Sequence, residues 1–182
     1  MNGGALYCKS TGAGGKGIST DQTLTINDGT VKVITTGKQY TYGSLDTSAK
    51  GIKSDEAMYI KGGNIMVRCT GGEGSEGIES KSTMTISGGN IMAYCYDDAL
   101  NSSKAMTISG GNIFAMGTNN DGIDSNSTLT ISGGLVIACG TTVPEDGFDC
   151  DDNTFTVTGG TLIGIGGATS TPTESVTTQP VA

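Results

Sequence analysis

Carboxylate side chains recur at two fixed positions around a repeated G-I-x-S motif. One position directly precedes the glycine or alanine that opens each copy, and the other lies two residues after it. In the last four copies these positions hold Glu76, Glu79, Asp98, Asn101, Asp121, Asp124, Asp146 and Asp149. In the first two copies they hold Lys16, Ser19, Lys50 and Lys53. We call these two sets of positions the acidic columns, and Asp97 lies directly beside them.

If successive copies stack on one another, the acidic columns place like charges side by side. Like charges opposite each other on neighbouring strands are destabilising, and at about 5 Å each close pair costs roughly 3 kcal/mol before screening. A bound cation removes this cost, and hard oxygen ligands suit Ca²⁺. The sequence has no His, and none of its Cys residues occupies a column position, which argues against zinc. We therefore predict Ca²⁺ at the acidic columns, with a solvated acidic edge that prevents aggregation as the alternative.

Paired carboxylates can also hydrolyse a glycosidic bond. Here, however, the pairs recur with the repeat, and nothing distinguishes one pair from the others. Arg68 is the only arginine, and without His no nucleophile can be assigned a base beside it. The sequence therefore predicts that the protein is not an enzyme.

The elements that position the acidic columns are short strands in a repeat of about 26 residues. Leu129 and Ile131 alternate with Thr130, a Gly-Gly pair follows, and a second alternating apolar run comes next. Apolar residues spaced two apart indicate strands and not helices. With the G-I-x-S segment as a third strand, the repeat predicts an all-β, right-handed parallel β-helix of six to seven coils.

The repeat predicts one elongated domain over residues 1–165. Residues 166–182 are rich in Thr, Ser and Pro and predict a polar tail or the start of a C-terminal cap. Because the sequence begins half way through a coil, we expect an upstream segment or a partner to cover that end in place of the missing N-terminal cap. No run of about 18 apolar residues is present, so no membrane insertion is expected. The net charge of −8 argues against binding to nucleic acid.

Two columns of outward-facing residues after the Gly-Gly pair are unusually apolar. Met66, Met92 and Phe114 share one column, and Tyr94 and Met116 share the next. We expect this face to pack against an upstream domain or another copy of the protein, with a carbohydrate platform as the alternative.

Two further sets of residues have alternative interpretations. Tyr40 and Tyr42 lie in a long loop over residues 37–50, and together with Tyr94 and Tyr96 they are candidates for stacking on a sugar. The alternative for the loop is that its aromatic residues only pin it in place. Outward T-x-T pairs form rows of hydroxyls that suit a polysaccharide or ice, although Thr is also simply a good strand residue. Ala57 and Ala105 interrupt these rows, which disfavours ice binding.

Cys69 and Cys95 occupy the same position of successive repeats. Neighbouring coils lie about 4.8 Å apart, which is within the reach of a disulfide. The alternative is a ladder of small buried thiols.

Several segments together resemble a known family. They read G-I-K-S-D, I-K-G-G-N-I, G-I-E-S-K, I-S-G-G-N-I, Y-D-D-A-L-N-S and N-D-G-I-D-S-N-S-T-L-T-I-S-G-G. In combination they resemble bacterial surface proteins described as carbohydrate-binding domain-containing. The resemblance implies a right-handed parallel β-helix similar to that of pectate lyases, and binding of plant polysaccharides, including cellulose and acidic sugars. It also implies calcium in the acidic turns, at Asp97, Asp98, Asp121, Asp124, Asp146 and Asp149.

The residues and the resemblance together predict a non-catalytic, extracellular or cell-surface protein that binds polysaccharide in a calcium-dependent way. Ca²⁺ would cancel the repulsion between carboxylates and could bridge to acidic sugars. The alternative is a structural module of a surface or filamentous assembly, which packs through its apolar outward face.

Overall fold

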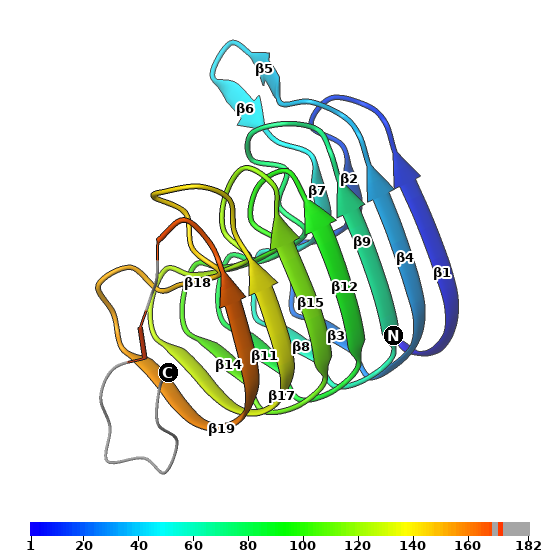
Figure 1. Ribbon diagram of the computed structural model, residues 1–182. Helices are drawn as coiled ribbons and strands as arrows, with labels where there is room; N and C mark the ends of the chain where they lie inside the picture. Colours follow the sequence, from blue (N-terminus) through cyan, green and yellow to red (C-terminus); the bar gives the residue numbers. More distant parts are fainter. Residues whose placement is uncertain (169–170, 173–182) are drawn as a thin grey trace.

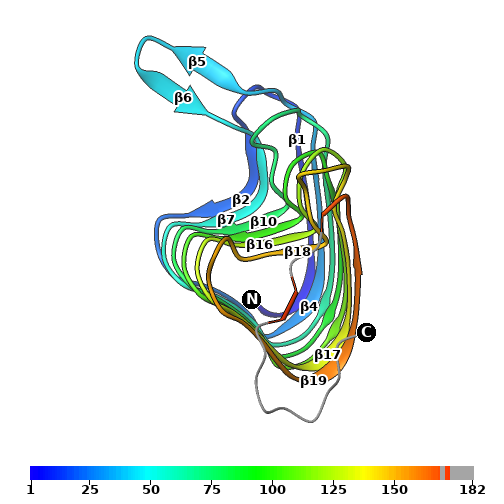
Figure 2. The same ribbon diagram turned by 60° about the vertical axis from the view of Figure 1, so that its left-hand side comes forward.

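The computed structural model describes residues 1–168 and 171–172, and within these residues the chain forms strands and turns with no helix. The strands stack in parallel and build a solenoid of about six coils, as Figure 1 and Figure 2 show. The predicted all-β solenoid is therefore confirmed, while its right-handed sense stays a prediction.

Each complete coil contributes one strand segment to each of three parallel ladders. Ladder one contains the G-I-x-S strands: β2 (Lys16–Thr20), β7 (Lys50–Ser54), β10 (Ile78–Ser80), β13 (Leu100–Ser102), β16 (Ile123–Ser125) and β18 (Phe148–Asp149). Ladder two contains β3 (Leu24–Ile26), β8 (Met58–Ile60), β11 (Met84–Ile86), β14 (Met106–Ile108) and the first parts of β17 (Leu129–Cys139) and β19 (Phe155–Ile165). Ladder three contains β1 (Asn2–Ser10), β4 (Asp28–Thr35), β9 (Asn64–Cys69), β12 (Asn90–Cys95), β15 (Asn112–Gly117) and the second parts of β17 and β19.

Alternation along each strand separates the core from the surface. On ladder two, Met84 and Ile86 are fully buried, whereas Thr85 between them is partly exposed. On ladder three, Ile91 and Ala93 are buried, and Met92 between them is 51% exposed. Successive side chains of a strand point to opposite faces, so the predicted inward and outward sets are both confirmed.

The Gly-Gly turns join ladder two to ladder three and fix the register of the coils. The second glycine of each pair takes a left-handed conformation, with φ of +98° at Gly89 and +103° at Gly111, which glycine adopts without steric cost. The first glycine is packed tightly, since a Cβ at Gly88 would lie 2.6 Å from the carbonyl oxygen of Lys61 in the preceding coil. These turns place an Asn at the start of β9, β12 and β15.

A column of buried serines forms the corner between ladder one and ladder two. Its members are Ser54, Ser80, Ser102 and Ser125, the last residue of each G-I-x-S motif. The Ser80 hydroxyl lies 3.0 Å from the carbonyl oxygens of both Glu56 and Thr83, which belong to successive coils. Ser80 and Ser125 therefore tie neighbouring coils together at a point where the strands are interrupted, whereas Ser54 and Ser102 bond to a carbonyl oxygen of their own coil.

The prediction of a loop over residues 37–50 is wrong in part, because this segment contains a hairpin of β5 (Tyr40–Tyr42) and β6 (Leu45–Thr47). The two strands pair in antiparallel fashion around Gly43, whose φ of +59° suits a tight turn. The hairpin projects away from the solenoid (Figure 2).

Cys69 and Cys95 are direct neighbours in the register of ladder three, and both are free and fully buried. Of the two interpretations, the ladder of buried thiols is therefore the one that the structure contains.

The last strand, β19, ends at Ile165. The predicted tail or cap over residues 166–182 falls largely on residues 169–170 and 173–182, which lie outside the described part of the chain. Within the described part, no helix is long and apolar enough to span a membrane.

Candidate functional site

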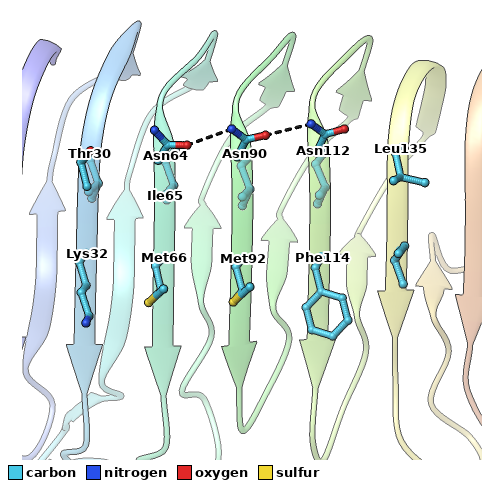
Figure 3. Close-up of a pocket in the computed structure, with 14 residues that line it drawn as sticks. Thr30, Lys32, Asn64, Ile65, Met66, Asn90, Met92, Asn112, Phe114 and Leu135 are labelled. Atoms are coloured by element: carbon cyan, nitrogen blue, oxygen red, sulfur yellow. Dashed lines mark hydrogen bonds between the residues drawn. The ribbon is translucent and has the colours of Figure 1, made fainter.

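A groove of about 420 Å³ runs along the outer face of ladder three, across β4, β9, β12, β15 and β17. Figure 3 shows that its side chains form two parallel rows, which follow the stacking direction of the coils and cross the strands. The groove thus uses the same strand positions in coil after coil.

The first row of the groove is polar, and we call it the Asn row. It consists of Asn64, Asn90 and Asn112, and the strand register continues it with Thr30 at one end and Leu135 at the other. The Asn90 side-chain amide donates to the Asn64 side-chain oxygen (2.9 Å), and Asn112 donates to Asn90 in the same way (2.9 Å). An amide group has two N–H donors and two oxygen lone pairs, so each Asn keeps hydrogen-bonding capacity for a ligand.

The second row lies two residues further along each strand, and we call it the apolar row. It consists of Met66, Met92, Phe114 and Ile137, with Lys32 in register before Met66. Met66 is 43% exposed and Met92 is 51% exposed, so no segment among residues 1–168 and 171–172 covers them. The Lys32 ammonium lies 5.5 Å from the centroid of the ring of Tyr7, its register neighbour on β1, and Lys32 is the last groove-lining side chain on that side.

A third row on the same face contains Tyr94 and Met116 in register, as the sequence predicted, and Arg68 precedes them in the same row. Tyr94 is 39% exposed, and the Arg68 guanidinium lies 5.9 Å from its ring centroid. That this face packs against an upstream domain or another copy of the protein stays a prediction.

The four candidate tyrosines do not form one site. Tyr40 and Tyr42 lie on the projecting hairpin (Figure 2), Tyr94 lies on the outer face of β12, and Tyr96 is half-buried just after that strand. The Asn row, which the sequence analysis did not single out, provides polar groups nearer to the groove. Its signal was present in the sequence, because an Asn follows the Gly-Gly pair in three successive copies.

The acidic columns lie at the other end of the ladder three strands, around the corner that leads into ladder one. Asp124 is paired in register with Asn101 on one side and with Asp149 on the other. The Asn101 amide lies 2.9 Å from an Asp98 carboxylate oxygen and 3.0 Å from an Asp124 carboxylate oxygen, and it donates to both. Asn101 therefore bridges the two columns and separates some of the carboxylates that the sequence predicted to repel each other.

Backbone N–H groups also stabilise carboxylates at this edge. The Asp121 N–H donates to the Asp98 carboxylate of the preceding coil (3.1 Å), and the Asp146 N–H donates in the same way to the Asp121 carboxylate. Asp97 accepts hydrogen bonds from the Gly74 N–H and from the Asn120 side chain, the latter at 2.6 Å. Asp97 thus links the corner loops of three coils.

Burial and mutual repulsion still disfavour the charged forms of the carboxylates at this corner. Burial raises the pKa of Asp98 to about 6 and that of Asp121 to about 7. The pKa of Asp124 rises to about 8, because of burial and then because of the nearby negative charges of Asp98 and Asp149. A positive ion at this corner would favour the charged carboxylates.

Glu76 and Glu79 have a different environment, because lysines already supply positive charge there. The Lys50 ammonium forms an ion pair with Glu76 and lies 3.5 Å from a Glu79 carboxylate oxygen. Lys81 forms an ion pair with Glu79, whose side chain is fully buried. Burial raises the pKa of Glu76, and the neighbouring Lys50 ammonium opposes this rise. This pair of glutamates therefore fits an ion-pair network better than a calcium ion.

The carboxylates of the later coils offer the hard oxygen donors that Ca²⁺ prefers. In the described residues, however, no three His, Cys, Asp or Glu side chains converge as a group that could hold a metal ion. An ion here would therefore take carboxylates from two neighbouring coils, such as Asp124 and Asp149, and complete its shell with water.

Comparison with known protein families gives one match. Residues 1–72 and 69–119 match the family described as carbohydrate-binding domain-containing protein, so about two thirds of the chain is covered. The matched part contains the whole Asn row, whereas Asp121, Asp124, Asp146 and Asp149 follow it in the sequence. Searches of curated proteins and of solved structures give no match.

Proposed function

Since the chain belongs to the family of carbohydrate-binding domain-containing proteins, we propose that it binds polysaccharide, without catalysis, in the groove on ladder three. The observation that carries this proposal is the groove itself, in which the Asn row lies directly beside the apolar row.

The two rows match the two kinds of surface that a sugar presents. Hydroxyl groups at the edge of a pyranose ring can exchange hydrogen bonds with the amides of Asn64, Asn90 and Asn112. The C–H faces of the ring can pack on Met92 and Phe114, because a binding groove combines apolar lining with a few placed polar groups. Membership of the family makes a polysaccharide the expected ligand of such a surface.

The lining of the groove supports a non-catalytic role. Glycoside hydrolysis normally needs two carboxyl groups on either side of the scissile bond. Among the described residues that line the groove there is no Asp or Glu, and Lys32 is the one ionisable side chain. A sugar bound there has no acid and base beside it.

We propose a structural role for Ca²⁺ at the corner of Asp98, Asp121, Asp124, Asp146 and Asp149. The raised pKa values of Asp98, Asp121 and Asp124 support it, since a cation would stabilise their charged forms. The Asn row begins the ladder three strands, and the acidic corner follows their ends. Polysaccharide binding would therefore depend on calcium through the stability of the later coils, and not through an ion that bridges to the sugar.

The polysaccharides that we propose are those of plant cell walls, namely cellulose or acidic pectin-like glycans. These polymers lie outside bacterial cells, so the proposal includes an extracellular or cell-surface location. It rests on the resemblance described above together with the family match.

The first test is retention of the protein on insoluble cellulose and on polygalacturonate. We expect retention on at least one polymer in the presence of Ca²⁺, and we expect competition by soluble fragments of the same polymer. Passage of the folded protein through both polymers without retention would contradict the proposed function.

A second candidate function is self-assembly through the same face. It is favoured by the exposure of Met66 and Met92, because contiguous exposed apolar side chains mark interaction surfaces. Sedimentation velocity over a range of concentrations tests it. Concentration-dependent association that a Met92→Lys substitution abolishes would support assembly, and a monomer at all concentrations would exclude it.

A further inference from the structure

The Asn row and the apolar row share one direction, which is the axis of the solenoid (Figure 3). Within a row, successive side chains come from neighbouring strands and are spaced about 4.8 Å apart. Across the rows, Asn90 and Met92 of one strand lie roughly 7 Å apart. A ligand that followed a strand would meet one amide and one apolar side chain, whereas a ligand that followed the axis would meet a whole row of each.

We propose that a single polysaccharide chain lies along the solenoid axis with one sugar unit over each coil, and that the Asn row reads its successive hydroxyls. This inference rests on the proposed function and adds the direction of the chain, its register and the residues that select it. The hydrogen bonds from Asn112 to Asn90 and from Asn90 to Asn64 orient all three amides in the same sense. Each sugar unit along the row therefore meets the same donor and acceptor arrangement as the unit before it.

The spacing of the row selects the geometry of the glycan. In an extended, β-1,4-linked pyranose chain, successive sugars follow one another at nearly the distance between neighbouring strands. An α-1,4-linked glucan coils, and its sugars leave the row after one or two units. The site therefore fits an extended β-linked chain and rejects a helical α-linked chain of the same sugar.

The ends of the rows define the length of the site. Polar positions extend over four strands, from Thr30 on β4 to Asn112 on β15, and Leu135 ends the row on β17. Lys32 is the one charged side chain among the described residues that line the groove, and it lies at the end near Thr30. We therefore assign four sugar subsites to the groove. Of the two proposed polymers, we expect the neutral one, cellulose, and not an acidic pectin-like glycan, to occupy them.

Isothermal titration calorimetry with β-1,4-linked gluco-oligosaccharides of two to six units tests the inference. We expect the affinity to rise about five-fold with each unit up to four, because each unit adds roughly one net hydrogen bond, and to level off beyond four. The α-1,4-linked oligosaccharides of the same lengths should show no such rise. Affinity that is independent of length, or equal for the two linkages, would overturn the inference.

The matched variants are Asn90→Leu in the middle of the row and Asn119→Leu, which is exposed outside the groove. Asn90→Leu should weaken binding of the four-unit chain about ten-fold and remove the length dependence, while Asn119→Leu should leave both unchanged. Circular dichroism confirms that each variant is folded. The length series on the unaltered protein tests the inference without any variant.

Failure of this inference is distinguishable from failure of the proposed function. Retention on an insoluble polymer that Asn90→Leu does not reduce would place binding on another face, so the axial site would be wrong and polysaccharide binding would stand. If the unaltered protein binds neither polymers nor oligosaccharides, both proposals are wrong.

Discussion

At the scale of single residues, charge is arranged differently from what the repeat alone indicates. From the repeat alone, Glu76 and Glu79 belong with the later aspartates, because they occupy the same columns. Lys50, the preceding member of one column, instead pairs with Glu76 and lies near Glu79. This contact could have been predicted, since stacking puts Lys50 directly beside Glu76. The pairing of Lys81 with Glu79 could not, because Lys81 lies outside the columns.

The ion-pair network leads to the first prediction. Replacing Lys50 by Met leaves the buried Glu76 carboxylate without its nearest cation, whereas Glu79 keeps Lys81. Breaking such a buried pair costs about 3–5 kcal/mol. We expect urea unfolding to show a loss of this order for Lys50→Met. Lys38→Met, at an exposed position, is the control and should change the free energy of unfolding by less than about 0.5 kcal/mol. Equal stability of the two variants would mean that the network contributes nothing.

The second prediction concerns pH. The pKa values of Asp98, Asp121 and Asp124 are about 6, 7 and 8 in the folded protein, against about 4 for an unfolded chain. Between about pH 4 and pH 8 the folded state therefore binds more protons than the unfolded state, and stability decreases as pH rises. With EGTA present, the melting temperature should be higher at pH 5 than at pH 8.

Asp124→Asn serves as the control for this pH dependence. It removes the carboxyl with the highest pKa of the three, so the difference in melting temperature between pH 5 and pH 8 should become smaller. A melting temperature that rises over this interval in EGTA would contradict the assigned pKa shifts.

At the scale of elements, the strands and their register were predictable and one insertion was not. The alternation of Met84, Thr85 and Ile86 is sufficient to define a strand and its buried face, and the repeat aligns each strand with the next. The segment over residues 37–50 has no counterpart in other coils, so the period carries no information about it. Its Y-T-Y run and Gly43 are the local signals of the hairpin.

The serine column gives the prediction at this scale. Ser80 is fully buried, and its hydroxyl contacts carbonyl groups of two coils. Ser80→Ala leaves these carbonyls without that donor and should cost about 1–3 kcal/mol, measured by urea unfolding. Ser44→Ala at the exposed hairpin turn is the matched control. If both variants unfold at the same urea concentration, the column does not hold the corner together.

At the scale of the whole molecule, the groove and the acidic corner are separate features of the same coils. The sequence contains both, as Asn after each of three Gly-Gly pairs and as Asp around the G-I-x-S motif. The acidic pattern was predictable because repeated carboxylates have an evident electrostatic cost, and the apolar row was predictable because outward Met and Phe are unusual. The Asn row was not predicted. The Asn side chains can be recognised as part of a binding groove only in the structure, where the register places them in one hydrogen-bonded row beside Met92 and Phe114.

This separation predicts how calcium and polysaccharide affect each other. A ligand that binds only the native state stabilises it, so Ca²⁺ should raise the melting temperature, and Asp124→Asn should reduce that rise more than Asp46→Asn on the hairpin does. Below the melting temperature in EGTA, retention on the polysaccharide should persist. Loss of retention in EGTA while the protein remains folded would instead indicate an ion that bridges to the sugar.

The most direct test of the central claim, that the outer face of ladder three binds polysaccharide, compares two lysine substitutions in the same coil. Met92→Lys changes the apolar row, and Thr85→Lys changes the outer face of ladder two. Retention on the insoluble polymer that holds the unaltered protein is the measurement. We predict that Met92→Lys reduces retention at least ten-fold and that Thr85→Lys does not. Equal retention of the two folded variants would contradict the assignment of the binding face.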